Sequence, residues 1–180
     1  MGGSQSVVED PPPLGRSPPL LQTSKNQDNT VIIPVDASKQ SESAFLWYMK
    51  HVHKPENKVE ILHCQEAHLT SPMLAEHSFK SESWAQMMEN ARQEGKGLVT
   101  KYEKRLADLG IKGDVHFEVG KPGELVVAAA KKYNADMIVM GTRGFGIIRR
   151  SVLGSVSEYV LHHSQVPVTV VPPDIQHWFF

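Results

Sequence analysis

The chain has little cysteine, little excess charge and no long apolar segment. Cys64 stands alone among 180 residues, which excludes an intramolecular disulfide and is typical of a reducing compartment. A formal net charge of -1 argues against a nucleic-acid partner, because such proteins carry a basic excess on the binding domain. No apolar run approaches the roughly 20 residues that a membrane-spanning helix needs. We therefore expect a soluble, cytoplasmic protein without stable membrane insertion.

The two ends of the chain differ in composition from its middle. Residues 1–28 are rich in proline and show no helical or strand period, which predicts a disordered tail. Gly2 and Ser6 match the myristoylation pattern. With neither a basic cluster nor a nearby cysteine, a myristoylated Gly2 would give only weak membrane contact. Residues 174–180 form an aromatic tail, ending in Trp178-Phe179-Phe180, that either folds back or docks elsewhere.

Between residues 29 and 173, short apolar strands alternate with amphipathic helical patterns. The expected strands cover residues 30–35, 58–64, 114–119, 138–140 and 166–171, and the expected helices cover 38–52, 84–109, 124–133 and a stretch from about 156. We expect Ser38 to cap the first helix and Leu109 to lie on the packed face of the second. The residues of the third helix expected to face the sheet are Leu125, Ala128 and Ala129. Such alternation is typical of β-α units with a parallel sheet. We predict one α/β domain, a Rossmann-like open sheet of five parallel strands with helices on both faces.

The most specific pattern follows the strand that ends at Met140. Gly141 stops this strand, Gly144 follows after two intervening residues, and Gly154-Ser155 follows after nine more. Ligands bind at the carboxyl ends of parallel strands, and a helix that begins near Val156 behind a Ser155–Glu158 capping box would attract an anion. The alternative is a connection whose glycines serve only turn geometry. The spacing fits neither a Walker A loop nor a dinucleotide fingerprint.

This pattern resembles the universal stress protein family, in particular its ATP-binding branch. The resemblance rests on the Gly-x2-Gly-x9-Gly-Ser spacing between the strand from Asp136 to Met140 and the strand from Val166 to Val171. It covers about residues 30–172. It implies an adenine nucleotide alpha hydrolase-like fold, ATP (or ADP or AMP) with Mg2+ as ligand, and a homodimer that pairs through Val166 to Val171.

The resemblance also assigns residues to the two parts of the nucleotide. The residues expected at the adenosine are Pro34, Val35, Asp36, Cys64 and Met140, and those expected at the phosphates are Gly141, Arg143, Gly144, Gly154, Ser155 and Val156. Two of them have structural alternatives, since Asp36 can hydrogen-bond the first turn of the following helix and Cys64 can serve as a small packed hydrophobe.

The function that the resemblance implies is that of an ATP-binding, dimeric regulator in a stress response. One alternative is a slow ATPase, although the glycine segment offers no carboxylate or glutamine to orient a water molecule, and we assign no catalytic residue. The other alternative is a dimeric interaction module without nucleotide turnover. No histidine or cysteine pair stands at metal-ligand spacing, so we expect no protein metal site.

Overall fold

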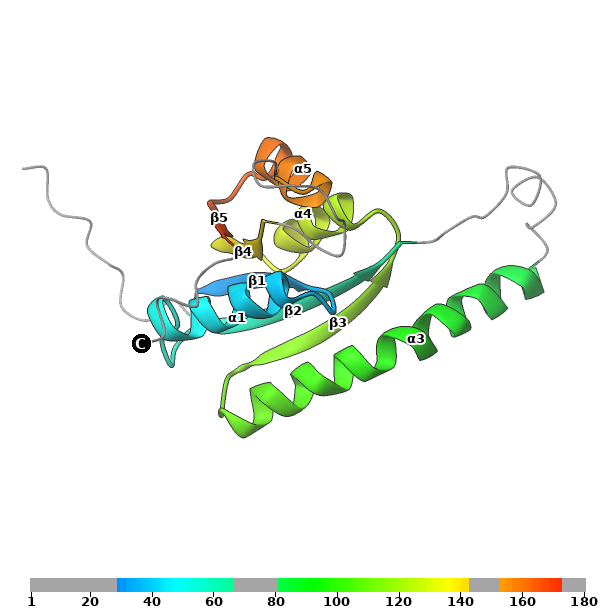
Figure 1. Cartoon of the computed structure of the whole chain (residues 1–180), viewed down its shortest axis with the longest axis horizontal. Helices are drawn as coiled ribbons and strands as arrows, with labels where there is room; N and C mark the ends of the chain where they lie inside the picture. The colour runs from blue at the N-terminus through cyan, green and yellow to red at the C-terminus, as the bar shows by residue number, and fades with distance from the viewer. Residues whose placement is uncertain (1–28, 67–80, 143–152, 173–180) are drawn as a thin grey trace, which may run out of the picture.

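A five-stranded parallel sheet lies between two layers of helices in the computed structural model, which describes residues 29–66, 81–142 and 153–172 (Figure 1). The strands are β1 (Thr30–Val35), β2 (Lys58–Gln65), β3 (Gly113–Val119), β4 (Met137–Gly141) and β5 (Val168–Val171); the helices are α1 (Lys39–His51), α3 (Ser81–Asp108), α4 (Pro122–Lys132) and α5 (Ser155–His163). This architecture confirms the predicted fold class. Among the described residues, no helix combines the length and apolarity that membrane crossing requires.

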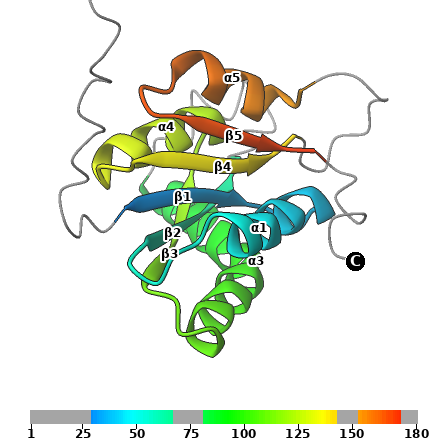
Figure 2. The same cartoon turned by 90° about the vertical axis from the view of Figure 1, so that its left-hand side faces the viewer.

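The strand order is β3-β2-β1-β4-β5, and Figure 2 shows the strands side by side in this order. The chain therefore moves outward from β1 to β3, returns to β4 beside β1, and moves outward again to β5. The pairing of β1 with β2 continues to Val35 and His63, whereas the described pairing of β1 with β4 stops at Ile32 and Ile138. The carboxyl ends of β1 and β4 thus separate at the point where the strand order reverses, which is where open α/β sheets bind ligands.

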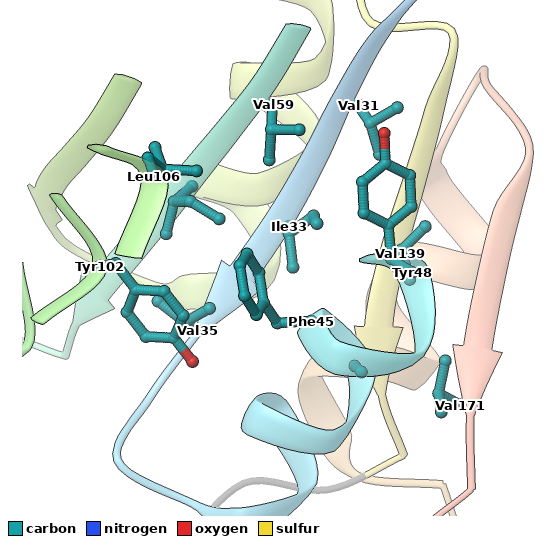
Figure 3. Close-up of a cluster of buried hydrophobic side chains, with 12 residues drawn as sticks. Val31, Ile33, Val35, Phe45, Tyr48, Val59, Tyr102, Leu106, Val139 and Val171 are labelled. Atoms are coloured by element: carbon teal, nitrogen blue, oxygen red, sulfur yellow. The ribbon is translucent and has the colours of Figure 1, made fainter. Parts of the chain in front are cut away.

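Large apolar side chains fill the face of the sheet that α1 and α3 cover. Phe45 and Tyr48 of α1 meet Tyr102 and Leu106 of α3 over the valines and isoleucines of the central strands (Figure 3). The Phe45 and Tyr102 rings contact edge to face, with centroids 5.3 Å apart, an arrangement that aromatic pairs favour. Helix α1 begins as predicted, because the Ser38 hydroxyl accepts the Ser41 N–H at 3.2 Å.

Smaller side chains fill the opposite face, under α4 and α5. Val126, Ala129 and Ala130 of α4 are buried there, so the prediction that Leu125, Ala128 and Ala129 face the sheet is wrong for Ala128, which is exposed, and for Leu125, which is only half-buried. The reason is that α4 packs against α5 as well as against the sheet. A Cβ at Gly123 would lie 2.7 Å from the Tyr159 ring, and this close contact orients the helix.

The same face also buries a charged cluster toward β3. Glu60 is 1% exposed, and its carboxylate lies 2.6 Å from the Lys58 Nζ atom and 2.6 Å from the His116 Nε2 atom. The His116 ring stacks on Tyr133, whose hydroxyl lies 3.2 Å from the His116 Nδ1 atom. Buried charges are tolerated when they are paired in this way.

Two boundaries differ from the prediction. Strand β5 begins at Val168 rather than Val166; Pro167 has no N–H to donate, although its carbonyl accepts the Ile138 N–H at 2.9 Å. Leu109, expected on the packed face of the long helix, is 59% exposed, because α3 ends at Asp108 and Gly110 turns the chain with a positive φ of 63°.

Candidate functional site

Three of the predicted adenosine residues share one face of the sheet. Pro34, Cys64 and Met140 each lie two residues beyond Ile32, Leu62 and Ile138, which belong to the cluster under α4 and α5, and alternate strand residues share a face. Cys64 and Met140 pack with that cluster themselves. Burial raises the pKa of Cys64 to about 12. The Cys64 side chain is therefore a neutral thiol at physiological pH and offers an apolar surface to a ligand.

Val35, the fourth predicted contact, points the other way. Its side chain is 4% exposed and packs with Phe45 and Tyr102 in the core under α1 and α3 (Figure 3). The Val35 carbonyl accepts a hydrogen bond of 3.1 Å from the His63 Nδ1 atom. Val35 can therefore offer a ligand only its backbone, a distinction that the resemblance did not make.

Asp36 follows β1 directly and forms a hydrogen-bonded turn with the start of α1. Its Oδ1 atom accepts the Ser38 N–H at 3.0 Å and the Ser38 hydroxyl. Its own N–H donates to the Ser41 hydroxyl at 3.2 Å. The structural role anticipated for Asp36 is thus present, and the described bonds of its carboxylate use Oδ1 and leave Oδ2 available to a ligand.

Gly141 stands at the end of β4, where the first turn of α1 presses on the strand. A Cβ at this position would lie 2.8 Å from the Gln40 carbonyl oxygen, closer than side-chain carbons approach backbone oxygens. Glycine is therefore needed here for packing whether or not a phosphate binds nearby.

Hydrogen bonds connect the end of β4 to the start of α5. The Gly154 N–H donates to the Thr142 carbonyl at 2.7 Å, and the Thr142 N–H donates to the Val171 carbonyl at 3.1 Å. The Ser157 hydroxyl donates to the same Thr142 carbonyl at 3.0 Å. These bonds hold the start of α5 beside the carboxyl end of β4.

The predicted capping box of Ser155 and Glu158 is wrong. Gly154, with extended backbone angles, is the N-cap of α5, and Ser155 is already its first residue. Within the part of the chain that the structure describes, no side chain caps the helix. The hydrogen bond from the Gly154 N–H to Thr142 sets the start of the helix, because it fixes Gly154 just outside the first turn. The Gly154 carbonyl then accepts the Glu158 N–H at 2.9 Å. The first-turn amides of α5, those of Ser155 and Val156 included, therefore have no side-chain acceptor among the described residues.

This end of α5 has the chemistry to receive a phosphate. Backbone amides and the positive end of the helix dipole favour an anion here. The Thr142 Oγ1 atom is buried beside it and has no hydrogen-bond partner in the described part of the chain. A buried hydroxyl without a partner is costly, so an anion at this position would find both the helix amides and an unused donor.

Two predicted phosphate residues, Arg143 and Gly144, lie outside the described residues, as do both chain ends. Within the described residues, no group of three His, Cys, Asp or Glu side chains is arranged to hold a metal ion. Sequence reasoning missed Ser41 and His63 as neighbours of the site. The Asp-x-Ser-x-x-Ser spacing from Asp36 to Ser41 was a usable signal for the first; none pointed to the second.

The fold defines a Rossmann-like α/β protein, and its candidate site lies at the reversal of the strand order. The family model described as "Universal stress protein family" matches residues 29–172. The chain belongs to the universal stress protein family.

Individual relatives agree with this assignment. The chain is 37% identical over 94 residues to the universal stress protein Slr1101 of Synechocystis, covering 52% of this chain and 87% of the relative. It also resembles the solved structure of the hypothetical protein MJ0577, with a TM-score of 0.63, 28% identity, and coverage of 81% of this chain and 96% of that one. A universal stress protein family protein from Arabidopsis thaliana, solved with AMP bound, shares the fold with a TM-score of 0.56, 20% identity, and coverage of 80% and 91%.

Proposed function

We propose that this protein binds an adenine nucleotide, ATP with Mg2+ in the first place, and acts as a dimeric regulator in a stress response. The observation that carries the proposal is the start of α5, which has no side-chain cap and is hydrogen-bonded to Thr142 where β1 and β4 separate. The AMP in the Arabidopsis thaliana relative supports the choice of an adenine nucleotide.

In this proposal the adenosine lies on the α4 and α5 side of the sheet. Pro34, Cys64 and Met140 present apolar surface there, and the carboxylate of Asp36 accepts hydrogen bonds from the nucleoside. The phosphates extend toward Ser155 and Val156, whose amides receive them. The Mg2+ ion is held mainly by phosphate oxygens and water, as is usual when the protein supplies few ligands.

The experiment that tests this proposal is a calorimetric titration of nucleotide-stripped, full-length protein with ATP and Mg2+. Saturable binding of about one ATP per subunit is expected. No binding would contradict the proposal and favour an interaction module. If binding is intact and turnover equals the background rate, the protein is a sensor rather than a slow ATPase.

The phosphate end can be tested separately with Ser155→Asp. A carboxylate in the first turn interacts favourably with the helix dipole but repels a phosphate. We expect unchanged or slightly higher thermal stability together with weaker ATP binding and unchanged adenosine binding. The control is Ser155→Asn, which has similar size and no charge. Equal ATP affinity in both variants would place the phosphates elsewhere.

The proposed dimer uses the open edge of β5. This strand pairs with β4 on one side, and its alternate residues Val168 and Val170 are half-buried. An apolar edge strand invites pairing with another strand. We expect light scattering at micromolar concentration to give the mass of a dimer, and Thr169→Lys to shift it toward the monomer. A monomeric wild-type protein would exclude this assembly.

A further inference from the structure

The Ser41 hydroxyl forms hydrogen bonds with both the N–H and the carbonyl of Asp36. The hydroxyl accepts the Asp36 N–H at 3.2 Å and shares its proton between the Asp36 carbonyl at 2.8 Å and the Ser38 carbonyl at 3.2 Å. Ser41 is 6% exposed, so these bonds are shielded from water. Ser41 therefore fixes the backbone from which the Asp36 carboxylate extends, while the Ser38 N–H and hydroxyl bind the carboxylate itself.

Helix α3 covers the Ser41 hydroxyl. Tyr102 of α3 is fully buried and lies beside Val35 at the carboxyl end of β1 (Figure 3). Among the described residues its hydroxyl has no hydrogen-bond partner of normal geometry. Burial raises the pKa of Tyr102 to about 12, and smaller effects come from nearby charges that include Asp36 and from the side chain of Ser41, which lowers the pKa. The Tyr102 ring thus closes the space behind the Asp36 turn, and its hydroxyl lies close to the side chain of Ser41.

Two ion pairs fix the first turn of α1 to α3. Glu42, next to Ser41, accepts hydrogen bonds from Arg105 and, at 3.3 Å, from the Lys101 Nζ atom. The hydrogen bond from Arg105 is the main reason that the pKa of Glu42 lies below its usual value. The helical turn that carries Ser41 is therefore held in place through its neighbour Glu42 by helix α3.

We propose that Ser41 is a positioning residue of the nucleotide site, which presents the Asp36 carboxylate to the nucleoside while α3 keeps Ser41 dry and in place. This inference rests on the proposed function. The described bonds of Ser41 converge on Asp36 and Ser38, and none reaches α5. Ser41 therefore acts on recognition of hydrogen-bond donors of the nucleoside, such as ribose hydroxyls, and leaves recognition of the phosphates unchanged.

The test is a calorimetric titration of the full chain with AMP and with ATP and Mg2+. We expect Ser41→Ala to weaken both affinities by the same factor, about five- to tenfold, as the loss of a buried hydrogen bond implies. Ser43→Ala is the matched control, since Ser43 lies on the same helix outside the bonds around Asp36. A Ser41→Cys variant, nearly the same size with a weaker donor, gives the same readout if the alanine variant folds poorly.

A double-mutant cycle separates positioning from general stability. If Ser41 acts through Asp36, the Ser41→Ala/Asp36→Ala double variant binds AMP as weakly as Asp36→Ala alone. If the losses of AMP affinity in the two single variants multiply in the double variant, the proposal is wrong. It is also wrong if the wild type binds AMP and Ser41→Ala binds it with the same affinity. A wild type that binds neither nucleotide would overturn the proposed function and, with it, this inference.

Discussion

The two faces of the sheet are stabilised in different ways. Under α1 and α3, large aromatic and branched side chains pack with few polar groups, and Phe45 and Tyr102 make the central contact. Under α4 and α5, alanines and valines pack around the sheet, and the face also buries Glu60 against Lys58 and His116. The stability of the first face therefore depends on how its side chains fit together, whereas the stability of the second also depends on the pairing of charges.

The candidate site lies at the carboxyl end of the sheet, where residues of both faces contribute. Val35 sends its side chain into the aromatic face, while Cys64 and Met140 contribute to the other face. The ligand surface that we propose is therefore an extension of the face with small side chains. The aromatic face supports the site from behind, through Tyr102 and the first turn of α1.

The largest expected effect comes from the aromatic face. Replacing Phe45 with alanine removes a fully buried ring and leaves a cavity, which should lower the free energy of unfolding by about 3–5 kcal/mol. Leu46→Ala, at a neighbouring residue that is 41% exposed, is the control and should cost less than about 1 kcal/mol. Urea denaturation measures both. Similar losses in the two variants would show that the packing of this face is not decisive.

The charged cluster should contribute less than the aromatic core. Glu60→Gln removes the charge that pairs with Lys58 and His116 and should cost about 1–3 kcal/mol. The control is Glu118→Gln on the neighbouring strand, where the side chain is 44% exposed and lies 3.7 Å from Lys132; such exposed pairs contribute about 0–1 kcal/mol. If both variants unfold at the same urea concentration, the burial of Glu60 brings no net stabilisation.

Two glycines of α3 provide a matched pair on the aromatic face. A Cβ at Gly95 would lie 2.4 Å from the Phe117 ring, whereas a Cβ at Gly97 would meet nothing within 4 Å. Gly95→Ala should therefore destabilise by about 1–3 kcal/mol, since Phe117 or the helix must move. Gly97→Ala should stabilise by up to about 1 kcal/mol through helix propensity. If chemical denaturation shows that both substitutions change stability in the same direction, the close approach of α3 to Phe117 is contradicted.

The smallest expected effect is a loss of stability at alkaline pH, to which the two faces contribute over different pH ranges. Burial raises the pKa of Cys64 and of Tyr102 to about 12, from 9.0 and 10.0 respectively. Because the unfolded chain loses these protons first, both contributions are complete below the unfolded values and decline as pH rises. Between pH 9 and 10 the decline should come mainly from Cys64, and Tyr102 should add to it above pH 10.

Urea denaturation at a series of pH values measures this decline. Cys64→Ala should flatten the early part of the curve and Tyr102→Phe the later part. An early decline that survives in Cys64→Ala would assign it to other groups.

Local signals in the sequence were enough for much of the fold. Thr30–Val35 reads as a buried strand, and Ser38 reads as an N-cap; the structure has both. The start of α5 could not be predicted in this way, because it depends on the Thr142 carbonyl, which belongs to the preceding strand end. The orientation of α4 depended equally on Tyr159 of another helix.

The sequence by itself determined the order of strands and helices, the parallel sheet and the family, because periodicity, caps and glycine spacing are properties of neighbouring residues. The tertiary structure alone decided which side Val35 faces, why Gly141 has no room for a side chain, and that Glu60 pairs with His116, 56 positions away. Such contacts join segments that are distant in the chain. Their geometry follows from how whole elements pack, which no local pattern specifies.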